Sequence, residues 1–335
     1  MHSGVRYTLV KASNFALKNH MERSRAESLM FVVASSLIAL STLFAVTWVA
    51  GFDHVAARLH AVDPVWFVTA FGAQIIAYAG YVLAYREVAR VGHDCELGTR
   101  SIVAAVTAGF GAFVARGGFA VDVHAFKQAG LTDQEVRVRV LGLGALEYAL
   151  LAPAACVVAI QLLADGHSPS LGLTLPWAIA VPLGFVAALW AVGRREELRA
   201  HAGRRRHFAE ALDSIYVLKR MFVQPKHALG PIGTALYWFG DIFCLWACLQ
   251  AFTHGTPDIS LLLLGYATGY ALTRRTLPLG GAGAVDALLP FALSWCGISL
   301  AAAVLAVFAY RVFNLWLPIV PAALGVRSMR AAASG

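Results

Sequence analysis

Ionisable side chains lie inside long apolar runs of this sequence, where each needs a partner, a ligand or water. Glu147, Asp241 and Arg311 all have such apolar surroundings in the sequence. A charged side chain in hydrocarbon is costly, and such residues commonly pair with one another or mark a polar pathway. These residue types predict a site for a charged ligand. Acid–arginine pairs that only fasten helices together are the alternative.

Two glycine-rich segments place further charges beside expected helix breaks. The first contains Arg116, Gly117, Gly118 and Asp122, and the second contains Arg274, Arg275, Gly280, Gly281, Gly283 and Asp286. A break exposes backbone N–H groups at membrane depth, and the start of a half-helix attracts anions. Paired breaks in the two halves of a chain point to a transport site. The two segments resemble each other, because each combines arginine, paired glycines and an aspartate. Both are short, so the alternative is that this resemblance arose by chance.

We therefore expect a polar cavity that binds an anionic headgroup. Its expected lining residues are Arg116, Asp122, Glu147, Asp241, Arg274, Arg275, Gly280, Gly281, Gly283, Asp286 and Arg311. Arginines in the glycine-rich segments would receive a phosphate group, because their planar fork suits it. Asp122 and Asp286 would hold the half-helices in position, or would pair with arginine between rounds of ligand binding. The sequence leaves open which acid meets which arginine.

The composition of the whole chain is that of a membrane protein. Its 335 residues are 59% hydrophobic and only 14% charged, whereas soluble domains carry about 25% charged residues. Apolar runs of roughly 20 residues recur along the chain, and each is long enough to cross a bilayer. These features exclude a soluble protein. The net charge of +8 is explained by basic cytoplasmic loops, without a nucleic-acid partner.

We expect an all-α polytopic fold in two pseudo-repeated halves, with about eight spans. The expected spans are 29–52, 64–85, 139–163, 172–193, 229–252, 259–276, 284–298 and 299–323. An apolar segment at 101–126 has arginines on both flanks, so it should begin and end on the same side of the membrane. We expect this segment to be re-entrant, with its turn at the glycines that follow Arg116.

Lysine and arginine predict the orientation, because they gather in cytoplasmic loops. The basic segments are 1–27, 194–227 and 326–335, and the loops almost without basic residues are 53–63, 164–171 and 253–258. We expect an inner (plasma) membrane protein with a transmembrane domain over 28–325 and with both tails in the cytoplasm.

The polar stretch 194–227 contains apolar residues at helical spacing. They are Phe208, Leu212, Ile215, Leu218 and Phe222, and basic residues at 204–206, 219 and 220 lie on the opposite face. This pattern predicts an amphipathic helix that lies on anionic headgroups. An ordinary basic loop that only sets the topology is the alternative.

Neither a metal nor an organic cofactor is expected. The five cysteines lie mostly in apolar runs, and Cys244 and Cys248 lack the further ligands that a metal site requires. The sequence contains no nucleotide-binding motif and no catalytic motif. We therefore expect no ATP-driven step within the chain, and no enzyme activity.

Residues 276–287 resemble the Pro-x-Gly-Gly-x-Gly-x-x-acid signature of the lysylphosphatidylglycerol synthase transmembrane (flippase-like) family. The stretch from Tyr310 to Pro318 is similar to the closing span of that family, with an arginine before aromatic residues and tryptophan. The segment 116–130 also looks like the family's mid-chain glycine-rich segment. The resemblance covers most of 28–325.

Two departures from the family pattern bear on the ligand. Asp286 stands where the family usually has glutamate, and residues 119–122 replace a Gly-Glu pair followed by arginine. We expect no aminoacyl-transferase domain after residue 325. The resemblance therefore implies lipid translocation and not lipid aminoacylation.

Together these features predict a translocator that moves an anionic or phosphate-bearing lipid between leaflets. An intramembrane lipid-linked transferase is one alternative, and a non-transporting partner in envelope assembly is another. The sequence leaves open the identity of the lipid, the direction and energy source of movement, and whether copies of the chain associate as a homo-oligomer.

Overall fold

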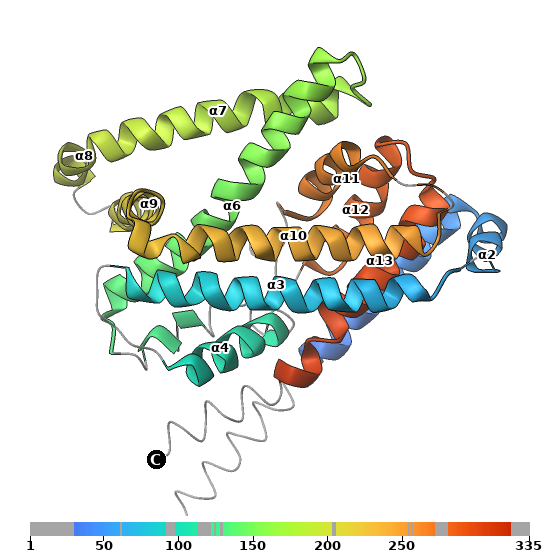
Figure 1. Cartoon of the computed structure of the whole chain (residues 1–335), viewed down its shortest axis with the longest axis horizontal. Helices are drawn as coiled ribbons and strands as arrows, with labels where there is room; N and C mark the ends of the chain where they lie inside the picture. Colours follow the sequence, from blue (N-terminus) through green and yellow to red (C-terminus); the bar gives the residue numbers. More distant parts are fainter. Residues whose placement is uncertain are drawn as a thin grey trace, which may run out of the picture.

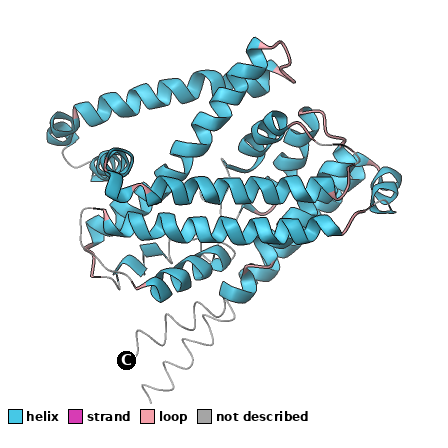
Figure 2. Cartoon of the chain, in the orientation of Figure 1, coloured by secondary structure: helices cyan, strands magenta, loops and turns pink. Residues whose placement is uncertain are grey.

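The computed structural model of the chain contains only helices and loops in the part that it describes (Figure 2). The described residues are 30–60, 62–91, 98–112, 122–123, 125–127, 130–202, 206–253, 255, 257–271 and 281–322. The expected all-α fold of a polytopic membrane protein is thereby confirmed.

Six helices are long and apolar enough to cross a membrane. They are Met30–Ala50, Val65–Arg90 (α3), Asp133–Ala164 (α6), Leu171–Gly193 (α7), Pro225–Gln250, which contains η1 (Pro225–His227) and α10 (Leu229–Gln250), and Leu300–Ala322, which contains α13 (Leu300–Arg311) and η4 (Val312–Trp316). The spans expected at 259–276 and 284–298 correspond to two shorter apolar helices, Ile259–Tyr270 and Ala284–Trp295.

The two shorter helices pack closely on one another. The first consists of α11 (Ile259–Tyr266) and the π-helical segment η2 (Ala267–Ala271), and the second is α12 (Ala284–Trp295). A Cβ at Gly269 would lie 2.5 Å from the Cα of Leu289, so only glycine permits this contact between η2 and α12. Gly283 precedes α12 with φ of +84°, a conformation that favours glycine. The described part of each of these helices is shorter than the roughly 20 residues that a membrane span requires.

Helices α3 and α10 lie side by side in the centre of the molecule (Figure 1). A Cβ at Gly240 would lie 2.5 Å from the carbonyl oxygen of Ala73, and one at Gly80 would lie 2.5 Å from the carbonyl oxygen of Gly233. The two backbones are therefore in direct contact at these glycines. In lipid, where hydrophobic attraction between helices is weak, such close packing is a main source of helix association.

Helix α7 lies at the edge of the molecule and packs mainly against α6 (Figure 1). Only Leu173, Thr174 and Trp177 are buried along its 23 residues. Its remaining apolar side chains are available to lipid, which is the usual surrounding of an exposed apolar span.

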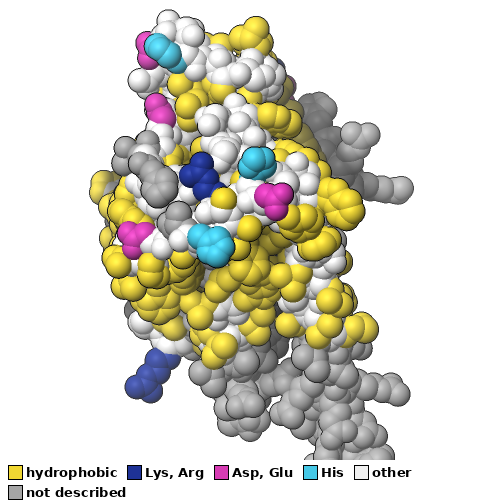
Figure 3. All heavy atoms as spheres, turned by 90° about the vertical axis from the view of Figure 1, so that its right-hand side faces the viewer, with side chains coloured by type: hydrophobic (Ala, Val, Ile, Leu, Met, Phe, Trp, Pro, Cys, Tyr) yellow, Lys and Arg dark blue, Asp and Glu magenta, His cyan; other side chains and the backbone are white. Residues whose placement is uncertain are grey.

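Short helices lie crosswise at both ends of the central pair. Helices α8 (Arg195–Ala202) and α9 (Arg206–Val223) are seen end-on at the left of Figure 1, and α2 (Phe52–His60) lies at the right. The right-hand end carries few lysine or arginine side chains and is mostly hydrophobic (Figure 3). The left-hand end holds the basic residues of α8 and α9. Charge is thus distributed unequally along the axis of the central helices.

The amphipathic segment expected within 194–227 contains the helix α9, but its apolar residues divide between two surroundings. Leu212 is buried, whereas Phe208 and Phe222 are 46% and 48% exposed. Part of the buried face is polar, because Glu210 accepts a hydrogen bond of 2.7 Å from Nε of Arg137 on α6. Helix α9 therefore packs on α6 through both polar and apolar contacts and leaves aromatic side chains exposed.

The expected re-entrant segment 101–126 is described in part. Its first half forms α4 (Thr99–Ala112), which packs against α3. The expected turn at Gly117 and Gly118 lies outside the described residues, as do the tails 1–27 and 326–335.

Candidate functional site

A fully buried carboxylate, Asp241 of α10, is the centre of a polar cluster within the described bundle. Tyr266 and Tyr310 donate hydrogen bonds to its Oδ2 atom, and Asn314 donates one of 2.8 Å to its Oδ1 atom. The three donors come from α11, α13 and η4. They offset part of the free-energy cost of burying a polar group away from water. Asp241 thus ties three helical elements to the central helix α10.

Two π-helical segments meet beside this cluster. Tyr270 belongs to η2, and its hydroxyl donates a hydrogen bond of 2.9 Å to Oδ1 of Asn314 in η4. π-Helical turns are rare and are frequent at functional sites, because the wider turn redirects side chains. A continuous hydrogen-bonded chain therefore runs from Tyr270 through Asn314 to Asp241.

A second buried carboxylate closes the helix break at Gly283. Asp286 accepts a hydrogen bond of 2.9 Å from the backbone N–H of Gly283 through Oδ2. Its Oδ1 atom lies 2.8 Å from Nε of Arg311, and the side chains of both residues are at most 1% exposed. The start of the half-helix α12 is therefore occupied by its own side chain, which also neutralises the buried arginine.

Arg311 has a donor that no described residue uses. Its Nη2 atom is buried and has no hydrogen-bond partner among the described residues. A buried guanidinium group normally satisfies its donors, and an unsatisfied one requires an explanation. The free edge of the guanidinium group can donate to a phosphate oxygen when a ligand reaches it.

A further pair of buried acids lies toward the middle of the bundle. Asp122 and Glu147 are each 3% exposed and close enough to interact electrostatically, with Tyr85 of α3 beside Asp122. Nε1 of Trp238, on α10, donates a hydrogen bond of 2.9 Å to the backbone carbonyl of Glu147. Trp238 precedes Asp241 by one helical turn, so α10 connects the two groups of acids.

The structure brings some of the expected site residues together and leaves others apart. Asp286 and Arg311 form an ion pair, Asp122 and Glu147 approach each other, and Asp241 binds hydroxyl and amide groups instead of arginine. Gly281 and Gly283 stand at the break with positive φ angles. Arg116, Arg274, Arg275 and Gly280 lie outside the described residues.

Several residues of the site were missed in the sequence. Tyr266 and Tyr270, like Tyr310 and Asn314, are four residues apart within apolar runs. Polar residues at this spacing lie on one face of a helix, and in a membrane span such a face points into protein or a wet cavity. This spacing was a usable signal for the cluster.

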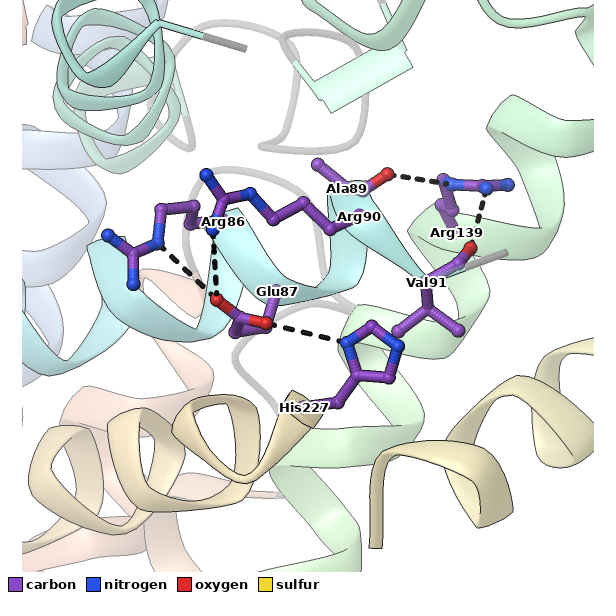
Figure 4. A network of polar contacts seen from close by, with 7 residues as sticks. All are labelled: Arg86, Glu87, Ala89, Arg90, Val91, Arg139 and His227. Carbon is purple, nitrogen blue, oxygen red and sulfur yellow. Dashed lines mark hydrogen bonds and ion pairs between the residues drawn. The ribbon is translucent and has the colours of Figure 1, made fainter. Parts of the chain in front are cut away.

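A second polar network lies at the C-terminal end of α3, where Glu87 approaches His227 of η1 (Figure 4). Glu87 is 3% exposed, and its carboxylate lies 3.4 Å from Nε of Arg86, 3.7 Å from Nη1 of Arg90 and 3.5 Å from Nδ1 of His227. Arg139 of α6 donates to the backbone carbonyls of the residues at positions 89 and 91. The expected span 64–85 ends before Glu87, so the burial of this carboxylate was not predicted.

A family of known proteins matches nearly the whole described chain. The family is described as the lysylphosphatidylglycerol synthase TM region, and the match covers residues 31–322. No curated protein matches the chain. The matched region contains every element of the buried clusters, and it agrees with the signature at 276–287. The chain is therefore a multi-pass membrane protein with a lipid-related function, and it belongs to the family of the lysylphosphatidylglycerol synthase transmembrane region.

Proposed function

We propose that this protein moves an anionic or phosphate-bearing lipid between the two leaflets of the membrane. The observation that carries the proposal is the buried donor of Arg311, which has no hydrogen-bond partner among the described residues and lies beside the helix break at Gly283. In a transport site, such a donor can bind the anionic group of the substrate.

The proposed cycle exchanges one anion for another at Arg311. In the resting arrangement Asp286 neutralises the guanidinium group, and a lipid phosphate would take its place during transfer. Because the side chain of Arg311 is 1% exposed, the half-helix α12 must move before a headgroup can reach it. In transporters, broken helices of this kind form the substrate site, and one helical bundle rocks or gates against another to open it.

The remaining arginines of the predicted site extend the proposal on sequence grounds. Arg274 and Arg275 precede the break in the chain, and Arg116 precedes the first glycine-rich segment. In the proposal they guide the phosphate toward or away from Arg311, since arginine binds phosphate through paired N–H donors. The protein itself performs no bond-making step. Its tails are assigned to the cytoplasmic side of the inner membrane by their basic residues.

The test is a leaflet-resolved assay in proteoliposomes. Purified protein is reconstituted with trace fluorescent phosphatidylglycerol, phosphatidylcholine or a polyprenyl phosphate, and a membrane-impermeant reductant then bleaches the outer leaflet. The proposal predicts that the protein increases the bleached fraction of phosphate-bearing lipids above that in protein-free vesicles. The phosphatidylcholine arm reports whether a net negative headgroup is required.

Two results would contradict the proposal. A new lipid product, formed when a labelled donor is added to the purified protein, would support the transferase alternative. No lipid movement by protein that is shown to be folded would support a non-transporting role in envelope assembly.

A further inference from the structure

A pocket of about 410 Å³ opens at the left-hand end of the molecule in Figure 1, between α6, α8 and α9. Its lining includes Arg139, Arg195, Arg220, Glu135, Asp213 and Tyr216. The volume lies within the range of small-ligand sites, roughly 300–1,000 Å³. None of these residues belongs to the clusters around Asp241 and Arg311, so the pocket is a separate feature.

The two carboxylates of the pocket already have partners. Glu135 accepts hydrogen bonds from the backbone N–H and the hydroxyl of Thr132, at 2.9 and 2.7 Å, and so caps the start of α6. Asp213 accepts two hydrogen bonds from Arg195, at 2.9 and 2.6 Å. Both acids therefore serve the fold, Glu135 as a helix cap and Asp213 as the partner of Arg195.

The described lining of the pocket contains one more arginine than carboxylates. Arg139 donates to the backbone carbonyls of the residues at positions 89 and 91, at the end of α3 (Figure 4), and these bonds orient its guanidinium group. Arg195 is paired with Asp213 and is stacked 4.3 Å over the ring of Tyr216. No carboxylate within the described chain pairs with Arg220, which is only partly exposed. Three arginines against two carboxylates favour an anionic ligand, and Arg220 is the arginine with donors to spare.

The position of the pocket favours a lipid headgroup as that anion. Helix α9 lies across the end of the long helices, where a membrane helix would meet the headgroup layer (Figure 1). The side chains of Phe208 and Phe222 on α9 are 46% and 48% exposed and can insert beside the acyl chains. Arg220 lies on the same helix, which places its charge at the depth of lipid phosphates.

We propose that this pocket, the α6–α9 pocket, binds the phosphate group of an anionic lipid through Arg220, with Arg195 and Arg139 supplying further positive charge. The inference goes beyond lipid movement, because it assigns a second, peripheral binding site that can be occupied whether or not the lipid is transported. Arg220 contacts the ligand directly, while Asp213 and Tyr216 hold Arg195 in position.

The experiment is a calorimetric titration of the full-length protein in a non-ionic detergent. The probes are dihexanoyl phosphatidylglycerol, dihexanoyl phosphatidylcholine and inorganic phosphate. The variants are Arg220→Gln, Arg220→Lys, and Lys219→Gln as a matched control. Lys219 is the exposed neighbour of Arg220 on α9 and does not line the pocket. Thermal unfolding of each variant confirms that it is folded.

The proposal predicts that phosphatidylglycerol binds more tightly than phosphatidylcholine. Arg220→Gln should raise the dissociation constant for phosphatidylglycerol about tenfold or more, since one hydrogen bond to a charged group is lost. Arg220→Lys should have an intermediate effect because it keeps the charge but loses the planar fork. Lys219→Gln should change the constant by less than about twofold, as expected of an exposed charge.

The phosphate arm separates the two sources of the ligand. Binding of inorganic phosphate that also depends on Arg220 would show that the phosphate group alone is recognised, and its absence would show that the lipid is required. Equal binding of the two lipids, equal effects of the Arg220→Gln and Lys219→Gln variants, or no binding of either anion would overturn the proposal. Because no leaflet movement is measured, a failure of transport with binding retained would count only against the proposed function.

Discussion

At the scale of single residues, the carboxylate of Asp286 has two structural roles. Asp286 caps the first turn of α12 through the N–H of Gly283 and neutralises Arg311 with its other oxygen. Both charges are buried, so removal of one partner leaves the other uncompensated in a region of low dielectric constant. Substitution of one partner should therefore lower the free energy of unfolding more than substitution of both partners together.

This reasoning predicts the stability of variants at the pair. Arg311→Met should lower the free energy of unfolding by about 3–5 kcal/mol, because Asp286 then remains buried without a counterion. The double variant Asp286→Asn/Arg311→Met should recover most of the loss, since an asparagine oxygen can still accept from Gly283. Denaturant unfolding in detergent measures both values.

The matched control is Arg194→Met. Arg194 is more than half exposed and lies 4.0 Å from Glu197, and such a surface pair contributes about 1 kcal/mol or less. A loss at Arg311→Met no larger than that at Arg194→Met would show that the buried pair does not support the fold.

At the scale of elements, the contact between α3 and α10 depends on the absence of side chains. Gly240 faces the backbone of Ala73 and Ala77, where a Cβ would lie 2.5 Å from an oxygen and a nitrogen atom. Backbone atoms cannot rotate away as a side chain can. The two helices would have to separate to admit even one methyl group, which would disturb the packing around Asp241 one residue later.

Alanine substitutions should therefore have opposite effects at two glycines. Gly240→Ala should destabilise the protein by about 1–3 kcal/mol through overpacking. Gly184→Ala should stabilise it by up to about 1 kcal/mol, because alanine favours the helix and nothing lies within 4 Å of a Cβ at that position of α7. Thermal unfolding of the two variants, measured side by side, gives the comparison. Equal effects of the same sign would contradict the close contact between α3 and α10.

Some elements were predictable from the sequence, and others depended on contacts between distant segments. Apolar runs of membrane-crossing length identified the six long helices, since length and hydrophobicity are local properties. Gly283 and Asp286 marked the start of α12, because both the turn and the cap are local as well. The pairing of α3 with α10 and the meeting of Tyr270 with Asn314 join segments far apart in the chain. Neither leaves a local pattern that determines the partner.

At the scale of the whole molecule, the two ends differ in charge. The end that contains α8 and α9 also holds the basic C-terminal turn of α3, whereas the opposite end, seen in Figure 3, carries few lysine or arginine side chains. An asymmetry of this kind predicts the orientation in the membrane. The same asymmetry predicts that the α6–α9 pocket lies on the cytoplasmic side.

Cysteine accessibility tests the orientation. On a cysteine-free background, Asp53→Cys on α2 should react with a membrane-impermeant maleimide in intact cells. Glu197→Cys on α8 should react only in inverted vesicles. Both positions are exposed in the structure, so their reactivity depends on the side of the membrane. The reverse pattern would place α8 and α9 outside and would contradict the assignment by positive charge.

The buried pair of Asp286 and Arg311 is the part of the molecule on which the proposed transport depends most directly. The decisive measurement is the initial rate of phosphatidylglycerol movement between leaflets by three folded proteins: the wild type, Arg194→Met and the Asp286→Asn/Arg311→Met double variant. We predict that the wild type and Arg194→Met move the lipid at similar rates. The double variant should be slower by about tenfold or more, because the donor for the phosphate is gone. Movement by the folded double variant at the wild-type rate would contradict a role of Arg311 in transport.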